Sequence, residues 1–375
     1  MPKVSAETWI QQLCDTLPAY LQRLAVPEHI GAFLPCERGV TKYGKAARLG
    51  FSCFALKIYY TTGLWERLPD QIKNAWRTSI QSFQTAQSLI GSRFHDGAFI
   101  DPPLFAFILS SLPPVFRFVH RFIPFAVPTA IQQLLYAETK QAIATLAQID
   151  DQPLRPYRGI PASGHQVRRF LEKLDWTKPW HAGGQAACLA FFLATQAPLL
   201  YDPQRCHALQ NAWSGFIEGI VDKGSGGYFR GPLPVHANLV SGAMKIISGL
   251  DWLGIPIHYP EALIDTCLQA LPPPEACHIV NTIYVLFQCL QQTSYKRDKV
   301  QSYCTEILRL IRRFYHRSGG FSYWIAKSQT HYYDVPISSG YDESDIHGTC
   351  LLTWALAMIF HLMEDTDAGW HIIKP

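Results

Sequence analysis

The stretch RDKVQSYCTEILRLIRRFYHRSGGFSY, residues 297–323, contains the pattern that decides the fold. Val300, Tyr303 and Ile307 begin a series of apolar residues at steps of three and four, which predicts an amphipathic helix over 297–314. The glycine pair at 319–320 then predicts a turn with positive φ, which ends the helix and sends the chain back. The aromatic residue that follows can fill the space beneath the turn.

Two kinds of helical segment alternate along the whole chain. The first kind is apolar on almost all sides and rich in small residues, which predicts buried helices. These segments are 45–62, 138–149, 181–195, 236–250, 277–290 and 347–362. The second kind is amphipathic, and its members are 6–24, 70–89, 165–174, 203–220, 260–271 and 297–314. Buried helices that alternate with half-exposed ones predict an all-α fold, an (α/α)6 toroid of inner and outer helices.

The Gly-Gly-aromatic turn is repeated. Residues 222–229 match residues 316–323, and 95–99 form a degenerate copy. Repeats of this length indicate stacked supersecondary units. No linker divides the chain, so we expect residues 1–375 to form a single domain.

Composition excludes some classes of function. The 33 basic and 29 acidic residues are scattered and give a net charge of +4, which provides no electrostatic basis for binding nucleic acid. None of the ten cysteines forms a CxxC pair, and no apolar leader opens the chain, so we expect a cytoplasmic protein with free thiols. Residues 102–130 are apolar but broken by prolines. They predict either a buried wall or a peripheral membrane contact through which a lipid substrate enters.

Residues 170–362 resemble the repeats of terpenoid cyclases and protein prenyltransferase β-subunits. The resemblance rests on the two Gly-Gly-aromatic turns and on the helices that follow them, which begin near His236 and His347. It implies a hydrophobic, isoprenoid substrate at the mouth of the ring. By the same resemblance His236 matches a position that contacts diphosphate, and Glu275, Cys277 and His347 match the zinc ligands. The basic residues that hold diphosphate in that family are absent from 271–274.

Histidines at the starts of predicted inner helices suggest a site without reference to any family. His181, His236, His278 and His347 hold such positions, and Glu138 opens another segment. Parallel inner helices gather their N-termini at one end of a ring, where neutral imidazoles suit base catalysis or metal ligation. The opposing interpretation is that each histidine only satisfies the start of a buried helix.

Two further chemistries are open. A buried Asp345 that stays neutral can protonate an alkene, and aromatic side chains can then stabilise a carbocation. The aromatic candidates for binding substrate are Tyr323, Trp324, Tyr332, Tyr333 and Trp354. Alternatively, the protein is a carbohydrate-active lyase, epimerase or hydrolase in which His331, Tyr332, Tyr333 and His347 transfer protons. A third hypothesis is a non-catalytic toroid that binds a lipid or a protein partner.

Overall fold

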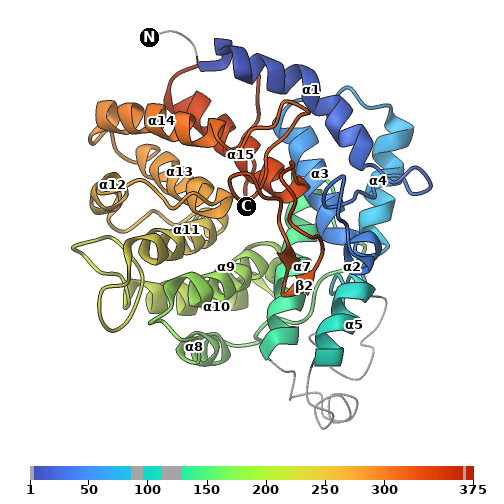
Figure 1. Cartoon of the computed structure of the whole chain (residues 1–375). Coiled ribbons are helices and arrows are strands. Elements are labelled where there is room, and N and C mark those ends of the chain that lie inside the picture. Colours follow the sequence, from blue (N-terminus) through green and yellow to red (C-terminus); the bar gives the residue numbers. More distant parts are fainter. Residues whose placement is uncertain (1–3, 86–95, 112–128, 366–368) are drawn as a thin grey trace.

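The computed structural model describes residues 4–85, 96–111, 129–365 and 369–375, and it is mostly helical (Figure 1). Its α-helices are α1 (Thr8–Leu24), α2 (Lys42–Ala46), α3 (Leu49–Thr61), α4 (Asp70–Gln81), α5 (Pro102–Ser111), α7 (Thr129–Ala147), α8 (Gly164–Glu172), α9 (Pro179–Thr195), α10 (Pro203–Glu218), α11 (His236–Leu253), α12 (Pro260–Leu268), α13 (Ala276–Leu290), α14 (Arg297–Arg312) and α15 (Ile346–Leu362). The described residues also include two short 3-10 helices, η1 (Val4–Ala6) and η2 (Ala197–Leu199).

Six helices form a closed series of contacts around the centre of the molecule. Helix α3 packs on α7, α7 on α9, α9 on α11, α11 on α13, α13 on α15, and α15 returns to α3. Each of the six predicted buried segments falls mainly on one of these helices, and each predicted amphipathic segment falls mainly on one of α1, α4, α8, α10, α12 and α14 outside them. The alternation of buried and half-exposed helices is therefore confirmed.

Some predicted boundaries are wrong. Helix α7 begins at Thr129, so Glu138 lies in the middle of that helix and not at its start. Residue 45 lies in α2, and α3 begins only at Leu49 because Asp101 accepts hydrogen bonds from the backbone N–H groups of Arg48 and Leu49 and fixes that end. Helix α4 ends at Gln81, and the predicted continuation beyond residue 85 lies outside the described residues.

The predicted turns are confirmed in both clear repeats. Gly319 and Gly320 have φ of 111° and 75°, and Gly226 has φ of 72°. The aromatic residues that follow, Phe321 and Tyr228, are fully buried. The turns therefore anchor outer helices to the core as the sequence predicts, whereas His95 of the degenerate copy lies outside the described residues.

Small residues let neighbouring inner helices approach closely. A Cβ atom added at Gly242 of α11 would lie 2.7 Å from Cβ and 3.0 Å from the carbonyl carbon of Pro179 in α9. Backbone atoms cannot retreat as a flexible side chain can. The α9–α11 interface therefore depends on the absence of this one carbon atom.

Replacement of Gly242 by Ala should destabilise the protein by about 1–3 kcal/mol, because overpacking forces the two helices apart. Gly215, inside the outer helix α10, is the matched control, since an added Cβ there meets no atom within 4 Å. Gly215→Ala should stabilise by about 0.5–1 kcal/mol through helix propensity alone. Urea unfolding of both variants measures the difference, and equal effects would contradict the packing argument.

A β-hairpin interrupts the all-helical plan. Strands β1 (His331–Tyr332) and β2 (Val335–Pro336) pair antiparallel and lie beside α7 in Figure 1. Tyr333 and Asp334 form its two-residue turn with φ of 47° and 62°. Turns of this kind normally use Asn and Gly, so a tyrosine in the left-handed region is unusual and strained.

The described helices include none that combines the length and apolar character needed to cross a bilayer. Of the predicted membrane contact at 102–130, the structure describes α5, and residues 112–128 lie outside the described residues. The peripheral contact therefore stays a prediction.

Candidate functional site

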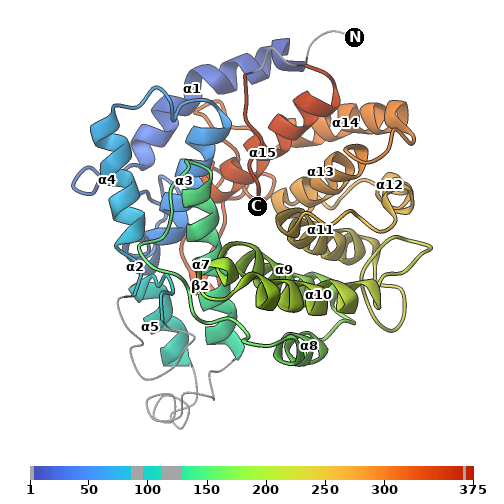
Figure 2. The same cartoon turned by 180° about the vertical axis from the view of Figure 1, so that it is seen from behind.

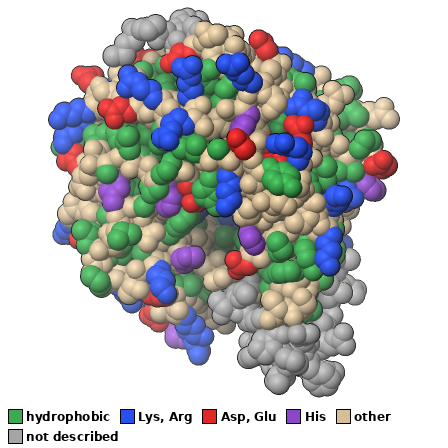
Figure 3. Space-filling model, in the orientation of Figure 1, with side chains coloured by type: hydrophobic (Ala, Val, Ile, Leu, Met, Phe, Trp, Pro, Cys, Tyr) green, Lys and Arg blue, Asp and Glu red, His purple; other side chains and the backbone are tan. Residues whose placement is uncertain are grey.

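A cavity of about 430 Å³ lies inside the closed series of six helices, and each of the six contributes to its lining. Figure 3 shows the corresponding face of the molecule, which is hollowed near its centre, with hydrophobic, cationic, acidic and histidine side chains around the hollow. The polar side chains that line the cavity are Lys57, Lys140, Gln141, Gln185, Lys245, Asn281, Gln329, Tyr332, Tyr333 and His347. This volume is typical of a small-molecule site.

Three lysines from different helices face this cavity: Lys57 from α3, Lys140 from α7 and Lys245 from α11. Within the described residues none of them forms an ion pair with a carboxylate. Lys57 Nζ instead donates a hydrogen bond to Gln141 Oε1 at 3.0 Å. Lys57 is buried, and Lys140 and Lys245 are half-buried. Ammonium groups that are removed from water without counter-charge are costly, so the convergence of the three indicates a site for an anion.

The pKa shifts agree with this picture. Burial lowers the pKa of Lys57, and the neighbouring charge of Lys245 lowers it further. Burial also lowers the pKa of Lys140 to about 8, with contributions from Lys245 and Lys57. An anion bound among the three would reverse these shifts, because opposite charge stabilises the ammonium form.

Neutral hydrogen-bond donors add to the three ammonium groups. The indole Nε1 of Trp354 and the amide Nε2 of Gln141 are buried and have no hydrogen-bond partner in the described part of the chain. Both residues line the cavity. A buried donor without a partner costs about 1–3 kcal/mol, which a ligand with several acceptor oxygens would recover.

His347 lines the same cavity as a neutral base. Its Nδ1 lies 3.0 Å from Gln329 Oε1, and its ring stacks on Phe54 with centroids 4.2 Å apart. Since the amide oxygen can only accept, Nδ1 carries the proton and Nε2 is the basic nitrogen. Burial lowers the pKa of His347 to about 3, and the charges of Lys245 and Lys57 contribute. The unliganded site therefore keeps this imidazole neutral.

The hairpin brings two tyrosines to the same cavity. Tyr332 is buried and donates its Oη hydrogen to Glu138 Oε1 at 2.6 Å. Tyr333, at the strained turn, lines the cavity beside it, and the two ring centroids lie 4.4 Å apart. Backbone strain that places a side chain in a cavity is typical of functional sites. The hairpin therefore supplies a phenol to the cavity that His347 and the lysines also line.

Glu138 supports the hairpin from beneath. Its Oε2 is buried without a partner, and burial raises its pKa to about 8, opposed by the hydrogen bond from Tyr332. Unfolding returns the carboxyl to an ordinary pKa near 4.3. Between these two values the folded protein holds a proton that the unfolded chain releases, so folding stability falls as pH rises.

Glu138→Gln should remove this dependence. We expect the wild-type protein to lose stability relative to the variant between about pH 5 and pH 8, by about 1.4 kcal/mol for each unit of pKa separation. Thermal unfolding of both proteins across this range measures the difference curve. A flat difference curve would show that Glu138 titrates alike in the folded and unfolded states.

The structure separates the predicted site residues into groups. The first group lines the cavity and comprises Cys277, Tyr332, Tyr333, His347 and Trp354. A second group lies at the starts of α9 and α13, where the His278 and Trp180 ring centroids are 4.9 Å apart and His181 neighbours Trp180. His278 Nδ1 also lies 3.1 Å from Ser241 Oγ.

Other predicted site residues support the structure around the cavity. His236 Nε2 lies 2.8 Å from the carbonyl oxygen of Thr266 in the outer helix α12 and is not part of the cavity lining. Asp345 caps α15, accepting from the backbone N–H groups of Gly348, Tyr323 and Gln329. Burial raises its pKa to about 7. Asp345 therefore fixes the helix and the loop that carry His347 and Gln329.

Glu275 joins two of the predicted aromatic residues. It accepts hydrogen bonds from Tyr323 Oη at 2.9 Å and from Trp324 Nε1 at 3.2 Å. Tyr323 in turn packs beside His347, with ring centroids 5.2 Å apart. Among the described residues no group of three or more His, Cys, Asp and Glu side chains is arranged to hold a metal ion. The zinc site of Glu275, Cys277 and His347 thus gains no support from the geometry and stays a prediction.

Sequence reasoning missed the three lysines and Gln329. A signal for the lysines was present, because Lys57 and Lys245 interrupt helices that are otherwise apolar on all sides. A charge inside a buried helix is rare unless it is paired or functional. Gln329 had no such signal, since it lies in a loop whose path only the structure gives.

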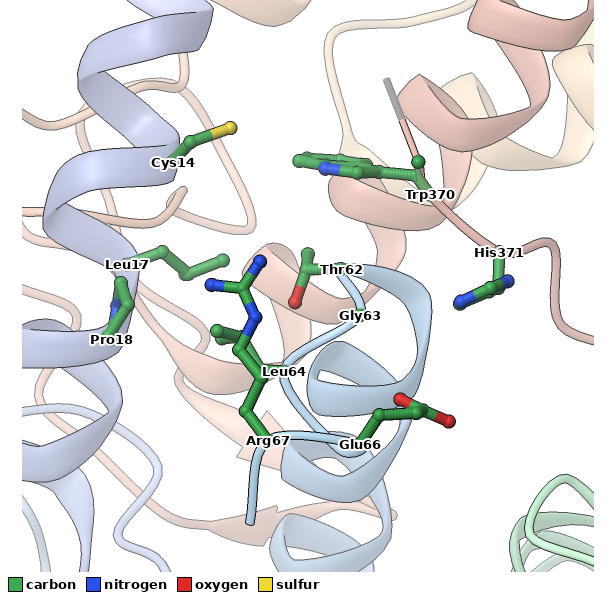
Figure 4. Close-up of a pocket in the computed structure, with 11 residues that line it drawn as sticks. Cys14, Leu17, Pro18, Thr62, Gly63, Leu64, Glu66, Arg67, Trp370 and His371 are labelled. Carbon is green, nitrogen blue, oxygen red and sulfur yellow. The ribbon is translucent and has the colours of Figure 1, made fainter. Parts of the chain in front are cut away.

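A second pocket of about 430 Å³ lies at the edge of the molecule, between α1, the loop after α3 and residues 369–371. Figure 4 shows Arg67 extending between Leu17 and Thr62, with Cys14 and Trp370 on the far side. Arg67 and Cys14 are exposed to solvent, and none of the predicted site residues lies here. The central cavity is therefore the candidate functional site.

Comparisons with known proteins find little. No family model matches the chain, and no curated protein matches its sequence. Among solved structures, a polysaccharide lyase matches with a TM-score of 0.45 and 10% identity, over 96% of this chain and 98% of that chain. The resemblance to terpenoid cyclases and prenyltransferases has no counterpart in these matches.

Proposed function

We propose that the chain is an (α/α)6 toroid enzyme that acts on an acidic carbohydrate in its central cavity, as a lyase or epimerase. The observation that carries this proposal is the convergence of Lys57, Lys140 and Lys245 without carboxylate partners among the described residues. The carboxylate of a uronate would supply the missing negative charge. The hydroxyl oxygens of the same sugar would accept hydrogen bonds from the unpartnered donors of Trp354 and Gln141.

The neighbouring side chains suit removal of a proton next to a carboxylate. Ammonium groups around the carboxylate lower its charge and stabilise the enolate-like transition state that forms when the adjacent C–H bond breaks. His347 Nε2 would accept that proton. Burial is the main cause of its low pKa, and the charges of Lys245 and Lys57 lower the pKa further. A substrate carboxylate would offset the contribution of the two lysines and so make the imidazole a stronger base than in the unliganded site.

Tyr333 would complete either reaction. In elimination, the electron pair of the broken C–H bond forms a C=C bond while the glycosidic C–O bond breaks, and the Tyr333 phenol protonates the departing oxygen. In epimerisation, the phenol returns a proton to the opposite face of the same carbon. Burial raises the pKa of Tyr333 well above its usual value, so the phenol is protonated in the unliganded protein.

The cavity suits an isoprenoid cyclisation less well. A carbocation beside three ammonium groups is destabilised by like charge, whereas a cyclase stabilises it with aromatic faces. A prenyl diphosphate remains a second candidate ligand, because its oxygens would also neutralise the lysines. A uronate polymer and a prenyl diphosphate give different products, so one panel of substrates distinguishes the two candidates.

The test is a panel of uronate polysaccharides (polygalacturonate, alginate, hyaluronan and heparan sulfate) beside neutral dextran and farnesyl diphosphate. A lyase should raise ultraviolet absorbance through the new conjugated double bond, and an epimerase should exchange the proton next to the carboxylate with deuterated water, detected by NMR. The proposal would be contradicted if the protein turned over dextran, or if farnesyl diphosphate were the only compound of the panel that it turned over. Elemental analysis of the same preparation tests the zinc prediction separately.

A further inference from the structure

The last described residues, Gly369–Pro375, form a segment that we call the C-terminal strap, and it crosses the C-terminal ends of the inner helices. His371 N–H donates to the carbonyl oxygen of Thr61, the last residue of α3, at 2.7 Å. Lys374 N–H donates to Gln148 Oε1, just after α7, at 3.2 Å. Figure 2 shows the C-terminus at the middle of the ring of inner helices.

The strap is latched on its far side to α11. Lys374 Nζ pairs with Asp251 Oδ1 at 3.2 Å and lies over the Trp252 ring at 4.7 Å from the centroid. Trp252 Nε1 donates to the Pro375 carbonyl oxygen at 2.6 Å. The strap therefore bridges α3, α7 and α11, which lie on different sides of the ring.

Two strap residues belong to the wall of the central cavity. Ile373 and Pro375 line it together with Trp354, while Tyr333 and His347 line it from the opposite end, where the inner helices begin. Ile373 is buried, and its apolar side chain can offer a ligand neither charge nor hydrogen bonds. Ile373 and Pro375 thus place the strap in the cavity wall, and the hollow in Figure 3 lies on the face that carries the hairpin.

We propose that the strap is the floor of the site and makes the cavity accessible from one end, so that it accepts the end of an acidic saccharide chain and not its interior. This inference rests on the proposed function for the identity of the ligand. A chain bound through its interior must leave the site on both sides, and the strap occupies one of those paths. The strap is then the segment that determines specificity for chain ends.

The experiment compares the wild-type protein with Lys374→Ala, which removes the ion pair to Asp251, and with a variant that lacks residues 369–375. The first readout is the mode of cleavage of the uronate polymer that the wild type turns over. The second needs no turnover: the rate at which iodoacetamide alkylates Cys188 and Cys350, which line the cavity, followed by peptide mass spectrometry. Cys267 and Cys304, buried away from the cavity, report any general unfolding.

The wild type should release small products while viscosity falls slowly, and loss of the strap should increase alkylation of Cys188 and Cys350 at least about tenfold without change at Cys267 and Cys304. A rapid fall in viscosity with wild-type enzyme, or equal alkylation with and without the strap, would overturn the inference. If no uronate polymer is turned over, the proposed function fails, and the alkylation rates still decide whether the strap closes the cavity.

Discussion

His347→Gln should lower kcat by about 10²–10⁴-fold, the contribution of a well-placed general base. The glutamine fills a similar volume but cannot accept a proton from carbon. The KM for the uronate polymer should change little, because the lysines that bind the carboxylate remain in place. Steady-state kinetics of the purified variant measures both parameters.

His236→Gln is the matched control, since His236 also stands at the start of an inner helix. Its Nε2 contacts the Thr266 carbonyl oxygen and does not face the cavity. This variant should keep kcat within about twofold and lose at most about 1 kcal/mol of stability. Equal losses of kcat in the two variants would mean that the helix starts matter for folding and that His347 is not the base.

Lys57→Met should weaken binding of the anionic substrate about 10–100-fold, the effect of removing one charge-assisted contact. The same substitution should stabilise the unliganded protein by about 0.5–2 kcal/mol, because it removes a buried ammonium that has no counter-charge. Calorimetric binding and urea unfolding measure the two effects. A substitution that weakens binding and at the same time stabilises the unliganded protein indicates that the charge of Lys57 serves function and not folding.

Lys299→Met on the exposed face of α14 provides the control for loss of positive charge. It should leave both affinity and stability within about 0.5 kcal/mol of the wild type. If Lys57→Met destabilises the protein and leaves affinity unchanged, Lys57 serves the structure and the anion site is assigned wrongly.

The arrangement of buried and half-exposed helices could be predicted because the hydrophobic pattern within each segment determines it. The apolar segments 236–250 and 347–362 can only be buried, and the amphipathic segment 297–314 can only lie at a surface, whatever their partners. The hairpin could not be predicted, since its tyrosine turn contradicts local propensity and depends on Glu138 from a distant helix. The start of α7 at Thr129 could not be predicted either. Residues 112–128, which precede it in the sequence, are rich in prolines and apolar residues and show no clear helical period.

The candidate site was predicted in part for a related reason. His347, Tyr332 and Tyr333 were found as side chains of the right chemistry near helix starts or loops. His236 has the same position and the same chemistry, and only the direction of its side chain toward α12 removes it from the cavity. Sequence gives no such direction without the neighbouring helix. The three lysines are far apart in the sequence, and only the packing of α3, α7 and α11 around one cavity brings them together.

The most direct test of the account is equilibrium binding of a uronate and its neutral counterpart, galacturonate and galactose, to wild-type protein and to Lys57→Met by calorimetry. The account predicts that galacturonate binds the wild type, that galactose binds at least about tenfold more weakly, and that Lys57→Met removes most of the difference. Equal affinity for the two sugars, or a preference for galacturonate that survives in Lys57→Met, would contradict an anion site built from the three lysines.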